Sequence, residues 1–409
     1  MKKFLAMLLA LVMALSLVAC GEQKQPDTPD VPDDGQQTAT VKVGFITLHD
    51  ENSTYDLNFI NAAKEAIANL GLTDADYILK TNVPEGQECY EAAVDMVDKG
   101  CNIIFADSFG HEPYMIQAAQ EYPDVQFCHS TGTRAHTEGL ANYHNAFASI
   151  YEGRYLAGIA AGLKLNEMID AGKFTADEAM VGYVGAFTYA EVVSGYTSFF
   201  LGVRSVCPTA TMKVTFTGSW YDEALEKEGA QKLIGLGCKL ISQHADSLGA
   251  PTACENAGVP NVSYNGSTEK ACPNTYIISS RINWAPYYEY AIKAVMDGTT
   301  IDTDWTGTLA TGSVVLTDLN TAVAAEGTAE AIAAATEKLE KGEIHVFDCA
   351  NFTVKGETLT SYQADVNADS DNTPDTEVVH DGYFSESEFR SAPYFDLEID
   401  GIERLDVAF

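Results

Sequence analysis

From residue 41 onward, short apolar runs alternate with longer amphipathic runs, and this alternation constrains the fold more than any other feature. The runs VKVGFIT, YILKT, NIIFA and VQFCHS are short and apolar, and stretches with helical periodicity separate them. Strands that alternate with helices build a mostly parallel sheet covered by helices on both faces. The alternation restarts at MVGYVGA and continues through MKVTFTG, KLISQH and VPNVSYN. The pattern therefore predicts two α/β sheets in one chain.

The two series also share a sequence motif. Residues 91–110 (EAAVDMVDKGCNIIFADSFG) align with residues 228–249 (EGAQKLIGLGCKLISQHADSLG) when Gln243 and His244 are treated as two extra residues. Each copy has the pattern of a helix, a strand and a loop that contains Ala-Asp-Ser. Because the match falls on the same element in each half, it indicates a duplicated lobe.

The length of the chain supports two lobes rather than one. The 369 residues from 41 to 409 exceed what a single hydrophobic core usually serves. We expect the chain to cross between the lobes about three times, a further strand over residues 344–348 (IHVFD), and irregular packing over one lobe from about residue 356. The expected bounds are 41–147 plus about 267–305 for lobe 1, and about 148–266 plus 306–409 for lobe 2.

The first forty residues have the pattern of an export signal and a tether. Lys2 and Lys3 precede the apolar run FLAMLLALVMALSLVA, which is shorter than the ~20 residues of a spanning helix. Leu17-Val18-Ala19-Cys20 is typical of a bacterial lipobox, in which Cys20 becomes the lipidated N-terminus, although an ordinary signal peptide with a chance cysteine is the alternative. Residues 20–40 are rich in proline, aspartate and glutamine and predict a disordered tether. We therefore expect a lipid anchor at the extracytoplasmic face of a bacterial cell membrane, after removal of residues 1–19.

Charge and cysteine content limit the partners and the redox state. The formal net charge is −35, and loss of residues 1–19 would remove two lysines and no acidic residue, giving −37. A surface this acidic repels nucleic acid and anionic lipid headgroups. Eight cysteines follow Cys20, and several lie in apolar strand patterns as small core residues do. We expect mostly reduced thiols rather than four disulfides.

Polar side chains follow equivalent strands in the two series. Asp107 with Ser108, and Asp246 with Ser247, come directly after predicted strands. In open parallel sheets, ligands bind beyond the carboxyl ends of the strands. These side chains and the free N–H groups of the following helices can orient a polar ligand. The alternative is that they only cap those helices, as these residue types prefer.

Aromatic residues gather at the same strand ends. They are Tyr55, which precedes Asp56, and Phe187, Trp220 and Trp284. Aromatic rings around one crevice favour stacking on a flat ligand ring, whereas ordinary core or rim packing is the alternative for each residue.

A hydrolase is the alternative from a different functional class. Residues 106–110 (ADSFG) imitate the G-x-S-x-G nucleophile elbow, with Ala106 in place of the first glycine and Ser108 at the nucleophile position. The nearby set of His244, Asp246 and Ser247 is too compact for a triad, because alternate residues of one strand end point apart. We therefore favour binding over catalysis, with an exported serine hydrolase as the less favoured alternative.

Metal and phosphate motifs are incomplete or absent in the sequence. Residues 364–377 partly match a calcium loop, but Ser370 stands at the glycine position and Thr376 at the position of the final glutamate. We interpret this stretch as an acidic surface loop. The chain contains no Walker, G-x-G-x-x-G or H-E-x-x-H motif. We expect no cofactor and no metal, and calcium binding by residues 365–377 is the less favoured alternative.

Taken together and in this order, several segments resemble the basic membrane protein (BMP) family of lipoproteins. The segments are GCNIIFADSFG, YPDVQFCHSTGT, EGRYLAGIAAGLK, VGYVGAF, EVVSGYTSFFLGVRSVCP, GSWYDEALEKEGAQKLIGLG, QHADS and INWAPYYEYAIKAVMDG. Members of this family are substrate-binding components of ABC importers and are related to purine-nucleoside receptors. The resemblance implies a two-lobed, hinged receptor that closes on its ligand and delivers it to a membrane permease without catalysis.

The resemblance also implies roles for individual residues. Purine-binding members place the base between aromatic rings and contact its nitrogen atoms with acidic and amide side chains. By this analogy Tyr55 is the stacking ring of the first lobe with Asp56 as its polar neighbour, although many relatives have Phe-Asn there. Phe187 would be the opposing ring, and Asp246 would accept a hydrogen bond from a purine N–H. The supporting residues would be Gln243, Asn265, Ser108 and Phe109, with Trp220 and Trp284 at the rim or hinge. The expected ligand is a purine nucleoside or base, and the alternatives are another flat heterocycle, such as a flavin, or a different small solute.

Overall fold

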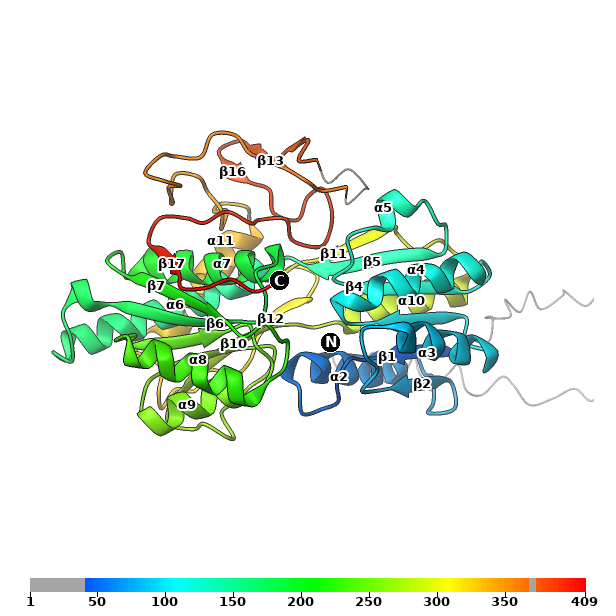
Figure 1. The fold of residues 1–409 in the computed structure, drawn as a ribbon, viewed down its shortest axis with the longest axis horizontal. Helices are drawn as coiled ribbons and strands as arrows, with labels where there is room; N and C mark the ends of the chain where they lie inside the picture. Colours follow the sequence, from blue (N-terminus) through cyan, green and yellow to red (C-terminus); the bar gives the residue numbers. More distant parts are fainter. Residues whose placement is uncertain (1–40, 368–372) are drawn as a thin grey trace, which may run out of the picture. The chain divides into compact units, whose positions relative to one another are not determined.

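The structure is a computed structural model that describes residues 41–367 and 373–409. The predicted signal peptide, the tether and Cys20 lie outside the described residues. Within the described residues, the main strands form one six-stranded and one seven-stranded sheet, and two small pairs of strands accompany them (Figure 1). The two sheets confirm the predicted two-lobed α/β fold.

The first sheet has the strand order β11-β5-β4-β3-β1-β2, and all neighbouring strands run parallel. Strands buried on both faces are nearly continuous apolar runs, as VGFI in β1 and IIFA in β3 show. Its strands are β1 (Val43–Ile46), β2 (Tyr77–Lys80), β3 (Ile103–Ala106), β4 (Gln126–Ser130), β5 (Tyr143–Ala148) and β11 (Asp304–Gly307).

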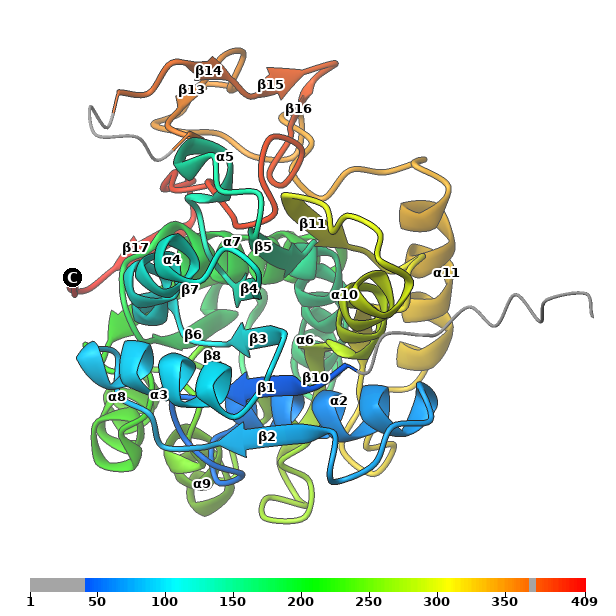
Figure 2. The ribbon, with the colours of Figure 1, turned by 90° about the vertical axis from the view of Figure 1, so that its right-hand side faces the viewer.

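Helices cover both faces of the first sheet (Figure 2). Helices α2 and α10 bury Phe59 and Tyr288 against Phe45 of β1 on one face. Helices α3 and α4 bury Met96 and Met115 against the other face. The helices are α2 (Thr54–Asn69), α3 (Gln87–Asp98), α4 (Glu112–Glu121) and α10 (Ala285–Asp297), with the short η1 (Phe109–His111) and α5 (Ala135–Glu138).

The second sheet has the order β12-β10-β9-β8-β6-β7-β17, and β12 is its antiparallel strand. Helices α6, α7 and α11 share one hydrophobic core, and α8 and α9 pack on the opposite face. The strands are β6 (Met180–Gly185), β7 (Thr211–Phe216), β8 (Leu240–Gln243), β9 (Asn261–Tyr264), β10 (Tyr276–Ile282), β12 (Val314–Leu316) and β17 (Ile402–Arg404). The helices are α6 (Ile150–Asp170), α7 (Ala190–Val206), α8 (Glu223–Gly235), α9 (Gly249–Ala257) and α11 (Thr328–Glu340), with the short η2 (Ala176–Glu178).

The duplicated motif occupies the same place in both sheets. Helix α3 leads into β3, which lies between β1 and β4, and helix α8 leads into β8, which lies between β6 and β9. The two Ala-Asp-Ser loops therefore leave the carboxyl ends of central strands, as the sequence match predicted.

The chain changes sheets after β5, after β10 and after β11, which agrees with the predicted three crossings. Neighbouring crossings are hydrogen-bonded to each other, since Ser149 N donates to Gly307 O (2.8 Å) and Asn283 N donates to Ser313 O (2.7 Å). The predicted boundary near residue 267 differs from the sheet pairing. Strand β10 pairs with β9 in the second sheet, so the return to the first sheet comes only after Ile282.

The strand predicted over residues 344–348 is wrong. Val346 and Phe347 are buried in the core of the second lobe, but the segment is a loop with an isolated bridge at Asp348. An apolar run indicates burial, but it does not require strand pairing. Here the side chains fill the core although the backbone forms no β-ladder. The following residues pack over α6 and α7 through Phe352 and Phe395, with the short pairs β13 (Gln363–Ala364) with β14 (Thr376–Glu377) and β15 (Val379–His380) with β16 (Tyr383–Phe384).

All eight cysteines in the described residues have free, buried thiols. Among the described helices, none combines the length and the apolarity that a bilayer crossing requires.

Helices α6 and α7 approach each other at glycines. A Cβ atom on Gly158 would lie 2.1 Å from the carbonyl oxygen of Phe199, and one on Gly202 would lie 2.0 Å from that of Tyr155. These neighbours are backbone atoms of packed helices, so they cannot move aside easily. The pair α6–α7 therefore requires a bare backbone at this crossing.

We predict that Gly158→Ala lowers the free energy of unfolding by about 1–3 kcal/mol, the usual effect of overpacking. This loss exceeds the ~1 kcal/mol that replacing a helical glycine with alanine otherwise gains. Gly235→Ala is the control, because no atom lies within 4 Å of the added methyl group. Urea unfolding followed by circular dichroism measures both variants, and equal loss of stability in the two would contradict the close packing of α6 and α7.

Candidate functional site

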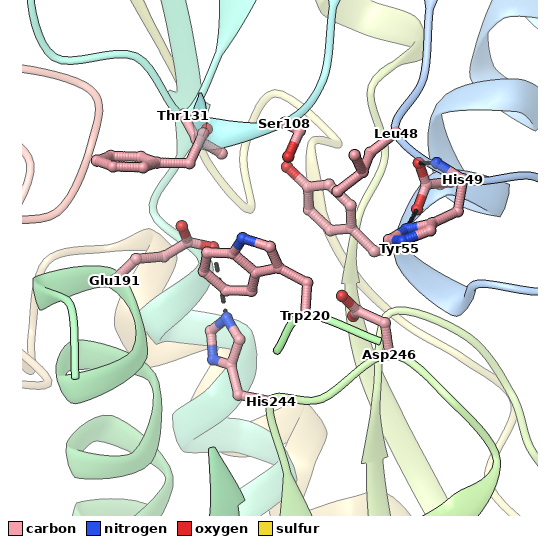
Figure 3. Close-up of a pocket in the computed structure, with 11 residues that line it drawn as sticks. Leu48, His49, Tyr55, Ser108, Thr131, Glu191, Trp220, His244 and Asp246 are labelled. Atoms are coloured by element: carbon pink, nitrogen blue, oxygen red, sulfur yellow. Dashed lines mark hydrogen bonds and ion pairs between the residues drawn. The ribbon is translucent and has the colours of Figure 1, made fainter. Parts of the chain in front are cut away.

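One pocket lies where loops of the two sheets meet (Figure 3). The space between its atoms, including solvent at its mouth, is about 360 Å³. Its walls come from loops beyond the carboxyl ends of β1, β3, β4, β7 and β8 and from the first turns of α2 and α7. The lining residues are Leu48, His49, Tyr55, Asp56, Ser108, Phe109, Thr131, Glu191, Trp220, His244 and Asp246.

The lobes touch directly beside the pocket. The backbone carbonyl of Asp246 accepts hydrogen bonds from Thr54 N (3.0 Å) and Thr54 Oγ1 (3.1 Å) at the start of α2. Phe109 of the first lobe stacks on Tyr189 of the second lobe, with ring centroids 5.3 Å apart. These contacts place polar and aromatic groups of both lobes against one small volume.

Asp246 faces the pocket and does not cap helix α9. The N-cap position of α9 is Leu248, and Ser247 Oγ accepts the hydrogen bond from Gly249 N (3.0 Å). The Asp246 carboxylate accepts from Asn265 Nδ2 (3.1 Å). Burial, and next the negative charges of Asp56 and Glu226, raise the pKa of Asp246 well above its usual value. The side chain is therefore a carboxyl group with few donors around it.

Asp56 is also buried, but its surroundings favour the ionised form. Burial raises the pKa of Asp56, whereas hydrogen bonds from His49 and Ser53 lower it further than burial raises it, so the net shift is downward. His49 N donates to Oδ1 (2.7 Å), and Ser53 Oγ donates to Oδ2 (2.6 Å). The two pocket aspartates thus differ in how many donors the protein supplies to them.

The first-lobe Ala-Asp-Ser loop is arranged differently from its second-lobe counterpart. Asp107 does not line the pocket, because its Oδ1 accepts from Leu48 N (3.1 Å) behind the wall. Ser108 lines the pocket, and its hydroxyl donates to Glu85 Oε1 (2.5 Å) rather than to a histidine. A serine nucleophile needs a base that accepts this proton and is oriented for catalysis, usually a histidine. The geometry gives no support to the hydrolase alternative.

Two of the predicted aromatic residues lie elsewhere. Phe187 does not line the pocket and does not oppose Tyr55 across it; it packs against Trp220 instead, with ring centroids 5.0 Å apart. Trp284 is buried in the core of the first lobe, where it stacks on Phe59 at 4.6 Å. Trp220, expected at the rim or hinge, lies in the middle of the labelled side chains in Figure 3.

Neither of the two predicted amide residues lines the pocket. Gln243 is buried and its Oε1 accepts from Asn261 Nδ2 (2.9 Å). Asn265 has a left-handed backbone, with φ of 66°, and its side chain reaches Asp246. Asn265 therefore orients a pocket residue, whereas Gln243 belongs to the interior of the second lobe.

Five pocket-lining residues were not among the predicted ligand-binding residues: Leu48, His49, Thr131, Glu191 and His244. Thr131 follows β4, so the strand-end rule that selected Ser108 would also have found it. Its backbone is left-handed (φ of 70°), an uncommon conformation for a β-branched residue. Its hydroxyl is buried and has no hydrogen-bond partner among the described residues. A strained residue with a free hydroxyl at a pocket wall is typical of a ligand site.

A buried arginine contacts His244, which in turn contacts Glu191. Arg154 of α6 is 1% exposed, and its guanidinium donates to Gln243 O (3.3 Å), to Tyr183 Oη and to His244 Nδ1 (3.0 Å). Its guanidinium carbon lies 3.7 Å from the centroid of the Tyr264 ring.

Arginine has no acceptor, so His244 Nδ1 accepts and the ring proton is on Nε2. His244 Nε2 then donates to Glu191 Oε1 (3.4 Å) at the pocket wall. Burial lowers the pKa of His244, which keeps the ring neutral. Arg154 thereby fixes the tautomer that orients Glu191.

The pocket has a one-sided charge. Asp56, Glu191 and Asp246 line it, whereas no lysine or arginine side chain of the described residues does. No group of histidine, cysteine and acidic side chains suited to a metal ion occurs in the parts of the chain that the structure describes. The expected acidic loop of residues 364–377 is partly outside those parts.

The fold and the pocket define a two-lobed solute-binding protein. The sequence model of a family described as PnrA-like ABC transporter substrate-binding proteins (Bmp) matches residues 45–346, and the chain belongs to this family. Proteins of this family bind solutes without catalysing a reaction, act on the extracytoplasmic side and work with an ABC permease. This confirms the family resemblance and the absence of an enzymatic role that the sequence predicted.

Two relatives of similar identity to this chain are named for different ligands. The chain is 32% identical over 262 residues to a purine-binding protein of Brucella abortus, covering 63% of this chain and 70% of the relative. It is 33% identical over 247 residues to a Haloferax volcanii protein whose assignment as an ABC transporter glucose-binding protein is provisional. That match covers 60% of this chain and 59% of the relative, so the chain spans less than two thirds of its length.

Solved structures show the same fold. An ABC transporter solute-binding protein of Conexibacter woesei superposes with a TM-score of 0.60 and 20% identity, covering 75% of this chain and 98% of that one. An ABC transporter solute-binding protein of Aeropyrum pernix gives a TM-score of 0.62 with 18% identity, covering 75% of this chain and 93% of that one. These similarities support the fold of the two lobes.

We predict that Arg154→Lys lowers the free energy of unfolding by about 2–4 kcal/mol, because a lysine ammonium cannot replace the planar fork and leaves buried acceptors unpaired. Arg134→Lys is the control, since its side chain is 39% exposed and pairs with Glu138 at the surface. Urea unfolding at neutral pH measures both variants. Comparable small effects in the two would contradict the role assigned to the buried guanidinium.

Proposed function

We propose that the protein is a receptor for a purine base or purine nucleoside, which it binds in the pocket between its lobes and delivers to an ABC permease. In this proposal Cys20 carries the lipid that holds the protein at the membrane. Tyr55, Phe109 and Trp220 contact the ring, and Asp56, Ser108 and Asp246 contact its polar edge. Asn265 orients Asp246, and Phe187 supports Trp220 from behind.

The observation that carries this proposal is the combination of aromatic faces and poorly satisfied carboxylates around one pocket. Aromatic side chains from both lobes can stack on a flat ring. The Asp246 carboxylate receives one hydrogen bond from Asn265, and Glu191 receives one from His244. A neutral purine supplies N–H donors to such acceptors, and a nucleoside adds ribose hydroxyls. The relative named as purine-binding in Brucella abortus supports the same class of ligand.

The charge of the pocket further narrows the ligand class. Three acidic side chains line the pocket, Asp56 is ionised, and no basic side chain of the described residues balances them. A phosphate group would be repelled at close range in a medium of low dielectric constant. We therefore expect bases and nucleosides to bind, and nucleotides to be excluded.

A sugar is the second candidate ligand. The relative from Haloferax volcanii carries a provisional glucose-binding assignment at similar identity. Carboxylates and aromatic faces also suit sugar hydroxyls and sugar rings.

A ligand panel separates these candidates. The soluble fragment of residues 41–409 is tested by thermal shift and calorimetry with adenine, guanine, adenosine, guanosine, AMP, riboflavin and glucose. We expect an increase in melting temperature with at least one base or nucleoside and none with AMP. Stabilisation by glucose or riboflavin with no response to any purine would overturn the purine assignment.

We predict that Asp246→Asn weakens purine binding about 10- to 100-fold, the usual effect of losing a charged hydrogen-bond acceptor. The pKa of Asp246 is raised in the free protein, and a purine N–H that donates to the carboxylate favours its ionised form. Binding by the unmodified protein should therefore release a proton, and it should tighten as the pH rises through the raised pKa that Asp246 has in the free protein.

Calorimetry in buffers of different ionisation enthalpy measures this proton release. The amide group that Asp246→Asn introduces cannot ionise, so the contribution of this position to the pH dependence should disappear in the variant. An unchanged pH profile in Asp246→Asn would show that Asp246 does not accept from the ligand.

A further inference from the structure

The last strand of the described chain extends the edge of the second sheet. Strand β17 pairs parallel with β7, and Leu405 N continues the ladder by donating to Val214 O (2.8 Å). The Asp406 carboxylate then accepts from Phe216 N (2.7 Å), Thr215 Oγ1 (2.6 Å) and Lys232 Nζ (2.9 Å). We call residues 402–408 the edge segment. It lies beyond residues 45–346, the range that the family model matches.

The edge segment ends between two loops that neighbour the pocket. Thr188 N donates to Ala408 O (2.7 Å), and Ala408 N donates to Thr188 Oγ1 (3.0 Å), so the two residues are joined by a reciprocal pair of hydrogen bonds. Ala408 also reaches the loop after β7, because its Cβ lies 3.8 Å from the position that a Cβ on Gly218 would take. One short segment thus contacts the loop after β6 and the loop after β7.

These two loops carry the aromatic residues beside the pocket. Phe187 and Tyr189 flank Thr188 and stack on each other at 5.1 Å, and both rings contact Trp220 from the other loop. Tyr189 stacks in turn on Phe109 of the first lobe. Trp220 and Phe109 line the pocket, whereas Thr188 and Ala408 do not.

We call the rings of Phe187, Tyr189 and Trp220 the aromatic wall. We propose that the edge segment positions this aromatic wall through the Thr188–Ala408 hydrogen bonds and thereby sets the affinity for the ring of the ligand. The identity of the ligand in this inference rests on the proposed function. The effect of the edge segment on the two loops does not depend on which ligand binds. Thr188 and Ala408 are positioning residues, since they act through Phe187, Tyr189 and Trp220.

The anchoring of the edge segment makes the effect local. Ile402 is buried in the core of the second lobe, and Asp406 is held by β7 and α8. The segment therefore stays in place when the Thr188 hydroxyl is removed. What changes is the restraint on the loop of residues 186–190, together with the rings it carries.

The test compares three variants of the full chain. Thr188→Val keeps the shape of the side chain but removes the acceptor of the Ala408 N–H, and Thr188→Ser keeps the hydroxyl. Glu403→Gln is the matched control, because Glu403 lies on β17 and pairs with Lys213 at the surface, away from both loops.

Two readouts are measured on each variant. Hydrogen exchange of the segment 186–192 in the ligand-free protein should be faster in Thr188→Val and unchanged in Thr188→Ser and Glu403→Gln. Calorimetry with adenine and adenosine should show about three- to tenfold weaker binding in Thr188→Val, the loss expected for one partly buried hydrogen bond. Melting temperatures of the three variants should stay close together.

Unchanged exchange and affinity in Thr188→Val would overturn the proposal, as would equal effects of the valine and serine variants. If the unmodified protein binds glucose or riboflavin instead of a purine, the proposed function fails, and the same comparison is made with that solute. If it binds none of these probes, the exchange measurement alone decides whether the edge segment orders the loop.

Discussion

Burying several carboxyl groups around one small pocket is costly, because each charge leaves water for a medium of low dielectric constant. The protein meets this cost differently for each acid. Asp56 receives donors from His49 and Ser53 and stays ionised, whereas Asp246 receives one amide donor and its pKa rises. Glu191 accepts a hydrogen bond from neutral His244, whose tautomer is fixed by Arg154. The pocket is thus short of hydrogen-bond donors, and a donor-rich neutral ligand is the group that best completes it.

The shortage of hydrogen-bond donors in the pocket also links ligand binding to the contact between the lobes. Asp246 belongs to the second lobe and Asp56 to the first, and the start of α2 reaches across to the Asp246 carbonyl. A ligand that donates to carboxylates of both lobes favours the arrangement in which the lobes touch, since only that arrangement brings all its acceptors together. Differential contacts of this kind are what a ligand needs to shift a conformational equilibrium. In the proposed complex, recognition and closure therefore have one cause.

Sequence patterns predicted most of the fold, because periodicity reports burial and parallel strands are nearly continuous apolar runs. The strand-end rule brought Ser108, Phe109, Trp220 and Asp246 to one place, and the structure has all four at the pocket. It could not tell which aromatic ring faces inward, since Phe187 and Trp220 both follow strand ends and only side-chain packing decides between them. Glu191 and His244 were not chosen because their roles depend on Arg154, which lies in a different helix. The misplaced boundary near β10 has a similar origin, because sheet membership is set by pairing and not by the strand's own sequence.

The pocket depends on two parts of the chain, residues 45–346 and residues 402–408, and this has a consequence for specificity. The acids and their supports, from Asp56 to Asp246, lie within residues 45–346, the range shared with the family. The aromatic wall also lies in that range, but two of its loops are held by residues 402–408, which lie outside it. A ring that stacks is sensitive to small displacements, because dispersion contacts weaken steeply with a gap of about 0.5–1 Å. Changes in the edge segment can therefore alter the fit of the ligand ring.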